Sequence, residues 1–96
     1  MAVGDTSSSS PRYSVRIKPA AEKEFVRLPA AIRERAASVI LAFETTPRPV
    51  GCQKLHDVDA YRVRIGDYRI VYTIDDKQRT VEVIAVRHRK DVYRRM

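Results

Sequence analysis

Cysteine is nearly absent from this sequence, and that absence excludes several classes of protein. Cys52 is the single cysteine, so no disulfide can form within the chain. One cysteine and two histidines, His56 and His88, are too few for a zinc site. We therefore expect no metal ion and no cofactor. A lone thiol also fits a reducing compartment.

Long apolar runs and glycine-rich loops are missing as well. No stretch approaches the roughly 20 apolar residues that a membrane-spanning helix needs. The first 11 residues lack the apolar core of a signal peptide. With three glycines there is no phosphate-binding glycine loop, and serine-nucleophile motifs are absent too. We expect a soluble, cytoplasmic protein that does not contact a membrane.

Basic residues, by contrast, are abundant. The chain has 19 lysines and arginines against 12 acidic residues, which gives a net charge of +7 and a pI near 10. Such a balance is typical of proteins that meet nucleic acid, an acidic protein or an anionic surface. Arginine outnumbers lysine, and a guanidinium can bind a phosphate through two hydrogen bonds where an ammonium acts as a point charge. The composition therefore favours a polyanionic partner.

The order of periodic segments predicts an α+β fold. Apolar residues at helical spacing predict two helices, separated at Pro29 and ended by Pro47 and Pro49. Alternating residues predict strands over residues 13–17, 61–65 and 68 to about 74. Residues 80–86 are apolar on both faces, which predicts an interior strand. Between the helices and the second strand, residues 50–60 are expected to form a loop.

These elements predict a β-α-α-β-β-β order in a single domain, residues 13–96. A helical hairpin would pack on one face of a small, mainly antiparallel sheet. Residues 1–12, which include a run of four serines, would form a disordered tail.

One stretch organises the predicted sheet. Residues 61–72 alternate apolar or aromatic side chains with arginines on both sides of Gly66-Asp67, which suits a two-residue type II′ turn. Such a turn places Arg64 directly opposite Arg69, with Arg62 two residues away on the same face. Like charges opposite one another cost about 0.2–1 kcal/mol. We interpret the cationic face as a site for an anion, although exposed arginines on a strand can also be ordinary surface residues.

The end of the last strand adds further candidates. Arg87, His88 and Arg89 reach the edge of the sheet there, and Tyr93 follows one helical turn later. Arginines can stabilise the charge that develops when a ribose 2′-OH attacks the adjacent phosphate of RNA, a reaction that requires no metal. His88 and Tyr93 are candidate proton carriers, and Tyr93 could instead stack on an unpaired base. A lone histidine is nevertheless more often a surface residue than a catalyst.

Three segments together resemble the RelE branch of the RelE/ParE toxin superfamily. They are Lys54-Leu55, residues 61–72 and residues 86–93, and the resemblance extends from Tyr13 to Arg95. It implies a type II toxin: a ribosome-dependent endoribonuclease that cleaves messenger RNA by 2′-OH attack and thereby inhibits translation. It also implies a cognate acidic antitoxin that neutralises the toxin in a hetero-oligomer.

The resemblance also implies residue roles. Arg62, Arg64 and Arg69 would hold the scissile phosphate, and Arg89 would stabilise or protonate the leaving 5′ oxygen. A guanidinium group stays protonated at physiological pH, so Arg64 is poorly suited to act as the base. The predicted catalytic residues are Arg62, Arg64, Arg69, His88, Arg89 and Tyr93, with either His88 or Tyr93 as the proton acceptor. The predicted RNA contacts are Lys54, Arg62, Arg64 and Arg87.

Two other functions are compatible with the sequence. The ParE branch shares the fold and acts on DNA gyrase without cutting RNA, although its members generally lack the concentrated arginine face and the terminal tyrosine. A non-catalytic RNA-binding module would use the same cationic face without the proton carriers.

Overall fold

The computed structural model describes residues 12–88, and residues 1–11 and 89–96 lie outside the described part. The predicted tail therefore falls outside it except for Arg12. The elements are β1 (Ser14–Ile17), α2 (Pro19–Val26), α3 (Ala30–Ala42), β2 (Gln53–Lys54), β3 (Tyr61–Ile65), β4 (Tyr68–Asp75) and β5 (Thr80–His88). The predicted α+β class and the predicted order of helices and strands are confirmed, with β2 as an addition.

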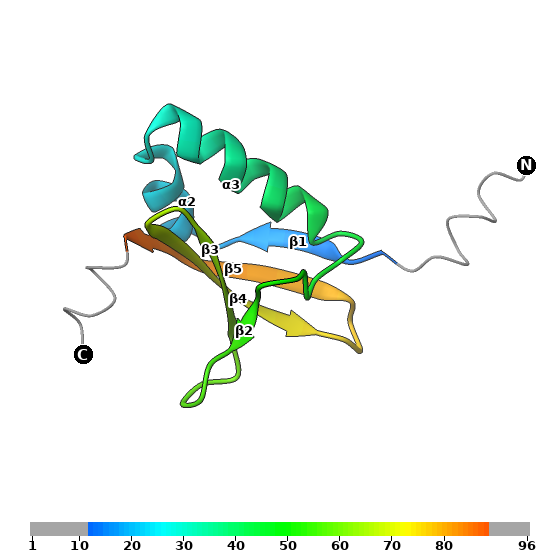
Figure 1. Ribbon diagram of the computed structural model, residues 1–96. Coiled ribbons are helices and arrows are strands. Elements are labelled where there is room, and N and C mark those ends of the chain that lie inside the picture. The colour runs from blue at the N-terminus through cyan, green and yellow to red at the C-terminus, as the bar shows by residue number, and fades with distance from the viewer. Residues whose placement is uncertain (1–11, 89–96) are drawn as a thin grey trace, which may run out of the picture.

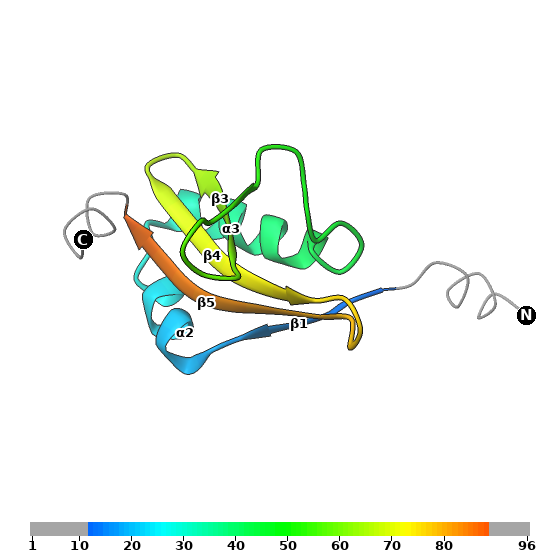
Figure 2. The ribbon, with the colours of Figure 1, turned by 90° about the horizontal axis from the view of Figure 1, so that it is seen from below.

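The strands form one sheet in the order β1-β5-β4-β3-β2. β1 runs parallel to β5, and the other three pairings are antiparallel. In Figure 1, α3 lies across one face of this sheet, while α2 packs against β5 near its end. Figure 2 shows the opposite face, on which no helix lies in front of β3, β4 and β5.

Prolines set where the two helices begin. Pro19 is the first residue of α2 and Pro29 caps α3, positions where a fixed φ suits the helix and a missing N–H costs nothing. The Arg33 guanidinium donates to the Leu28 carbonyl at 3.0 Å and closes the turn between the helices. Neither of these helices is long and apolar enough to cross a membrane.

The core lies between α3 and the sheet. The predicted stripe of α3 contributes Ala36, Ile40 and, just after the helix, Phe43, all buried. Phe43 stacks on Tyr72 of β4 with ring centroids 4.2 Å apart. The Tyr72 hydroxyl donates to the Pro47 carbonyl at 2.8 Å, so this buried phenol keeps a hydrogen bond. Because the apolar side of the sheet is covered in this way, polar residues are left on the other face.

The loop prediction for residues 50–60 is wrong in part. Gln53 and Lys54 form β2, which pairs with Arg62 and Tyr61 of β3. The Leu55 N–H donates to the Ala60 carbonyl at 2.8 Å and closes the remaining loop. A strand of two residues has no alternation to detect, because pairing with β3, and not the local sequence, creates it.

Candidate functional site

The hairpin of β3 and β4 has the predicted register. Arg64 pairs with Arg69, and Arg62 pairs with Val71. Gly66 has a φ of +60°, and Asp67 does not have a positive φ, which fits a type II′ turn. Glycine is required at the first turn position because other residues are strained there. The turn therefore puts Arg62, Arg64 and Arg69 on one face of the sheet, the face toward the reader in Figure 2.

A third strand extends this face. Arg87 of β5 pairs with Arg69, so Arg64, Arg69 and Arg87 form a row across β3, β4 and β5. We call this set the arginine row. Arg69 is only 7% exposed, whereas Arg64 is exposed. A buried guanidinium with a further guanidinium on each side makes this region strongly attractive to an anion.

One carboxylate offsets part of that charge. Glu24 of α2 accepts a hydrogen bond from Arg87 Nε at 3.0 Å through Oε2, and from the Val86 N–H at 2.9 Å through Oε1. The Val86 N–H lies beyond the last pair of β1 with β5, which is Ile17 with Val83, so Glu24 satisfies a backbone donor that β1 does not reach. Sequence reasoning missed Glu24, because a glutamate on a short helix carries no signal of a contact 63 residues away.

A concave site of about 210 Å³ adjoins the β3 end of the row. Gly51, Gln53, Arg62 and Arg64 line it. Arg62 donates through Nη2 to the side-chain oxygen of Gln53, which lies directly opposite on β2. Gln53 was missed at the sequence level because β2 was missed.

His88 is not on the arginine face. It pairs with Tyr68, and the two rings meet edge to face with centroids 5.1 Å apart. Tyr68 packs against the core, so His88 lies on the side of the sheet that faces the helices. Together with Glu24, Arg27, Leu28, Tyr68, Val86 and Arg87, it lines a second concave site of about 280 Å³ at the end of β5, beyond its last pair with β1. The predicted convergence of His88 with Arg62, Arg64 and Arg69 is therefore not found.

Lys54 is also separated from the arginines. It pairs with Tyr61, whose ring stacks on the buried Tyr72, so Lys54 shares the helix-facing side of the sheet. Its Nζ lies 3.6 Å from an Asp59 oxygen and 6.0 Å from the centroid of the Tyr61 ring. The remaining predicted residues, Arg89 and Tyr93, lie outside the described residues.

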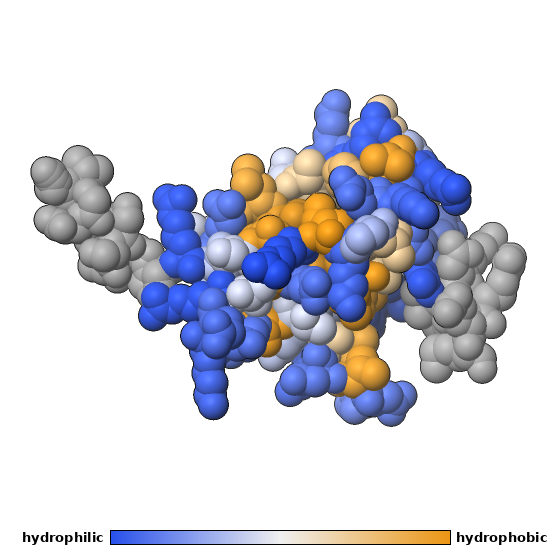
Figure 3. Space-filling view, turned by 180° about the vertical axis from the view of Figure 1, so that it is seen from behind, coloured by the Kyte–Doolittle hydropathy of each residue, from blue (hydrophilic) through white to orange (hydrophobic). Residues whose placement is uncertain are grey.

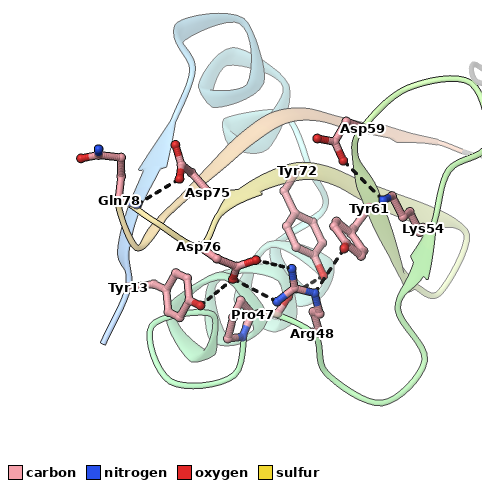
Figure 4. A network of polar contacts seen from close by, with 10 residues as sticks. All are labelled: Tyr13, Pro47, Arg48, Lys54, Asp59, Tyr61, Tyr72, Asp75, Asp76 and Gln78. Atoms are coloured by element: carbon pink, nitrogen blue, oxygen red, sulfur yellow. Dashed lines mark hydrogen bonds and ion pairs between the residues drawn. The ribbon is translucent and has the colours of Figure 1, made fainter. Parts of the chain in front are cut away.

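A polar network at the other end of the molecule holds the segment between α3 and β2 (Figure 4). Arg48 donates to both oxygens of Asp76, at 3.3 and 2.9 Å, and to the Tyr61 hydroxyl at 3.2 Å. Asp76 also accepts a hydrogen bond from the Tyr13 hydroxyl at 2.7 Å. The hydrogen bonds from Arg48 and Tyr13 lower the pKa of Asp76, and the same contact with Asp76 raises the pKa of Tyr13. The network positions the chain that leads into β2.

Metal ligands do not gather in the described residues. Between residues 12 and 88, no group of three or more His, Cys, Asp or Glu side chains lies close enough together to hold a metal ion. The described residues provide cationic hydrogen-bond donors on one face of the sheet. Two concave sites lie at the ends of the arginine row.

Comparisons with known proteins agree with this architecture. Residues 15–93 match the family model described as the ParE toxin of the type II toxin–antitoxin system parDE. The chain is 37% identical to the toxin RelG of Mycobacterium tuberculosis over 87 residues, which cover 86% of this chain and 98% of that protein. It is 36% identical to the toxin RelE of the same organism over 86 residues, covering 85% and 87% of the two chains.

Solved structures show the same fold. The archaeal RelE–RelB complex from Pyrococcus horikoshii OT3 superposes with a TM-score of 0.74 at 28% identity, covering 81% of this chain and 96% of that chain. The isolated Escherichia coli RelE toxin superposes with a TM-score of 0.69 at 26% identity, covering 88% and 99%.

Proposed function

The chain belongs to the ParE toxin family of type II toxin–antitoxin systems, in its RelE-like branch, and from this premise we propose that it is a metal-independent endoribonuclease that cleaves messenger RNA on the ribosome. The single observation that carries the proposal is the arginine row. Three guanidinium groups in register across adjacent strands are suited to holding one phosphate linkage of RNA, and Arg62 extends the cationic face along β3.

The proposed reaction uses the nucleophile that RNA already contains. The ribose 2′-OH attacks the adjacent phosphorus, the bond from phosphorus to the 5′ oxygen breaks, and a 2′,3′-cyclic phosphate and a 5′-OH result. Negative charge builds up on the phosphoryl oxygens, where Arg64 and Arg69 donate hydrogen bonds. Because Arg69 is buried, its charge is held in place before the reaction and is screened less by water, which strengthens this stabilisation.

Two protons must move in this reaction. The 2′-OH loses one, and the leaving 5′ oxygen gains one, a step we assign to Arg89 as the group that stabilises or protonates it. His88 and Tyr93 are the two candidate acceptors. The edge-to-face contact of His88 with Tyr68 on the helix-facing side favours Tyr93 as the proton acceptor.

A cognate antitoxin is the proposed partner. The structural neighbours from Pyrococcus horikoshii and Escherichia coli include complexes of RelE with RelB. In this chain an apolar groove of about 280 Å³ lies between β1, α2 and α3, lined by Val15, Ile17, Phe25, Ala37, Ile40, Leu41 and Glu44. Figure 3, which views the β1 edge of the sheet, shows an apolar area framed by polar residues. An acidic, amphipathic antitoxin segment would cover the apolar area and meet the net charge of +7.

The proposal is tested by expression without an antitoxin. Induction of the untagged protein in bacteria should arrest growth, and primer extension should reveal discrete cuts within codons of messenger RNA. The Arg69→Ala variant should be non-toxic. Arg16→Ala, which removes an exposed arginine from the far strand β1, should remain toxic. Normal growth with folded wild-type protein would contradict the proposal.

The same experiment separates the rival functions. A gyrase-directed toxin, as in the ParE branch, should leave messages intact and induce DNA-damage signals, and Arg69→Ala should have little specific effect. A non-catalytic RNA-binding module should bind RNA without producing new 5′ ends. The relatives at 36–37% identity carry the names RelE and RelG, and this favours the nuclease.

A further inference from the structure

Gln53 lies where the two-residue strand β2 widens the arginine face. It pairs with Arg62, so its side chain is on the same face as Arg62 and Arg64. Its side-chain oxygen accepts a hydrogen bond from Arg62 Nη2. With Gly51, these residues line the concave site of about 210 Å³. Although β2 has only two residues, it places the hydrogen-bond acceptor of Gln53 beside Arg62.

The chemistry of that neighbour matters. An amide oxygen fixes the plane of the guanidinium but leaves its positive charge intact, whereas a carboxylate would offset the charge. At the opposite end of the row, Arg87 instead donates a hydrogen bond to the carboxylate of Glu24, which offsets part of its charge. Gln53 therefore holds Arg62 in place without itself offsetting the positive charge.

The position of Arg62 separates it from the centre of the row. Along β3 it lies two residues, or about 6.6 Å, from Arg64. Arg64 therefore belongs both to the arginine row and to the concave site beside it. A strand of RNA that presents one phosphate to Arg69 can present the next one to Arg62, with Arg64 between them.

The path of the chain into β2 supports a built site. Gly51 has a φ of +94°, in the left-handed region that favours glycine, and the Cys52 N–H donates to the Pro49 carbonyl at 3.0 Å. This turn brings Gln53 into register with Arg62. A Cβ at Gly51 would meet nothing within 4 Å, so that wall of the site is open to a ligand.

We propose that the concave site of Gly51, Gln53, Arg62 and Arg64 binds the RNA phosphate next to the scissile one, and that Gln53 is a positioning residue that orients Arg62 toward it. This proposal rests on the proposed nuclease function, because one phosphate is scissile only if the protein cleaves RNA. The binding of an RNA phosphate by this site can be measured without any cleavage.

The first test is binding. A short, fluorescently labelled single-stranded oligoribonucleotide is titrated with the purified protein, and Kd is read from fluorescence anisotropy. Gln53→Met keeps the size of the side chain and removes the acceptor, and it should weaken binding about fivefold, the value of one hydrogen bond. Gln78→Met, the same change at an exposed glutamine in the turn between β4 and β5, should leave Kd unchanged.

A double-mutant cycle tests whether Gln53 acts through Arg62. Arg62→Ala should weaken binding, and adding Gln53→Met to it should cause no further loss, because the residue that Gln53 orients is gone. Independent, multiplicative losses would overturn the positioning role. A Kd for Gln53→Met equal to that of the wild type would also overturn it.

Gln53→Glu tests the role of charge and remains informative if the methionine variant is poorly folded. The carboxylate should hold Arg62 but offset its charge, so the slope of log K against log salt should fall by about 0.7 for a single strand. An unchanged slope would contradict a phosphate at this site.

Cleavage on programmed ribosomes then separates the two proposals. Gln53→Met should raise KM several-fold while kcat changes less than twofold, because the interaction is made equally in the ground and transition states. A loss of kcat alone would overturn the assignment to a neighbouring phosphate. Wild-type protein that binds the oligonucleotide as expected but cuts no message would refute the nuclease and leave the phosphate site standing.

Discussion

Glu24 and Arg87 are 63 residues apart in sequence, yet the Arg87 Nε lies 3.0 Å from a Glu24 oxygen. The pair joins α2 to the end of β5, and the second oxygen of Glu24 accepts the Val86 N–H at 2.9 Å. One carboxylate thus fixes a helix to the sheet and offsets the charge of one member of the arginine row. Glu24 therefore stabilises the fold but weakens the attraction of the arginine row for an anion.

The first prediction concerns this opposition. Glu24→Gln removes the negative charge but keeps one acceptor, so it should lower the free energy of unfolding by about 1–2 kcal/mol. The arginine row then carries one more uncompensated charge, so RNA should bind more tightly at low salt and with a steeper salt dependence. Urea unfolding and oligoribonucleotide titrations at several salt concentrations measure the two effects. Glu34→Gln, at an exposed position of α3, is the matched control and should change neither. Weaker RNA binding by Glu24→Gln would contradict this account.

The second prediction concerns Arg64, which faces Arg69 directly. Arg64→Thr removes a like-charge pair and adds a residue that suits a strand, so it should raise the free energy of unfolding by about 0.2–1 kcal/mol. The same change should lower cleavage of messenger RNA about 10²–10³-fold, the usual cost of losing one donor to a developing negative charge. Chemical denaturation and cleavage on programmed ribosomes give the two values. A variant that is both less stable and fully active would show that the arginine face serves the fold rather than the reaction.

The third prediction concerns the proton acceptor. Because His88 contacts Tyr68 on the helix-facing side of the sheet, His88→Gln should change the cleavage rate less than threefold. The loss of the ring contact should cost about 0.5–1.5 kcal/mol of unfolding free energy. The measurement is a rate profile over pH for the wild type and the variant. If the variant lost activity as severely as Arg64→Thr and lost the acidic limb of its profile, His88 would be the base after all.

The hairpin and the helical stripe could be predicted because each depends on local sequence. Gly66-Asp67 fixes the register of β3 against β4, and with it the pair of Arg64 and Arg69. Proline positions and apolar spacing fix both helices of the hairpin. In each case residues within one turn or one helix decide the outcome, and no distant contact overrides them.

The position of Arg87 in the arginine row depends on a β-bulge in the pairing of β4 with β5. Asp75 to Tyr72 pair regularly with Thr80 to Val83, but Val71 pairs with Ala85, so Ile84 is an extra residue in β5. Without this bulge Arg69 would face Val86 instead of Arg87. In the structure Val81, Val83 and Val86 are buried, so the spacing of the core residues changes from two to three. Because Ile84 and Ala85 are apolar as well, the sequence carries no signal of this change. The burial of Arg69 likewise follows from neighbours on other strands and has no local signal.

The last prediction concerns the network of Arg48, Asp76 and Tyr13 at the other end of the molecule. Asp76 has its pKa lowered mainly by its hydrogen bonds from Arg48 and Tyr13. A carboxyl group whose pKa is depressed in the folded state contributes stability above its unfolded pKa, near 3.9, and loses it as pH falls through the folded value. Asp76→Asn should therefore unfold at a lower temperature than the wild type between about pH 5 and pH 8, and the difference should shrink below about pH 4.

Thermal unfolding followed by circular dichroism over that range makes the measurement. Asp57→Asn changes an exposed carboxylate in the loop after β2 and should track the wild type at every pH. Because the network holds the chain that leads into β2, Asp76→Asn should also weaken the pairing of Gln53 with Arg62, visible as faster hydrogen exchange of the Leu55 amide. A pH-independent difference in unfolding temperature would show that the Asp76 carboxyl stabilises the fold through packing and not through its charge.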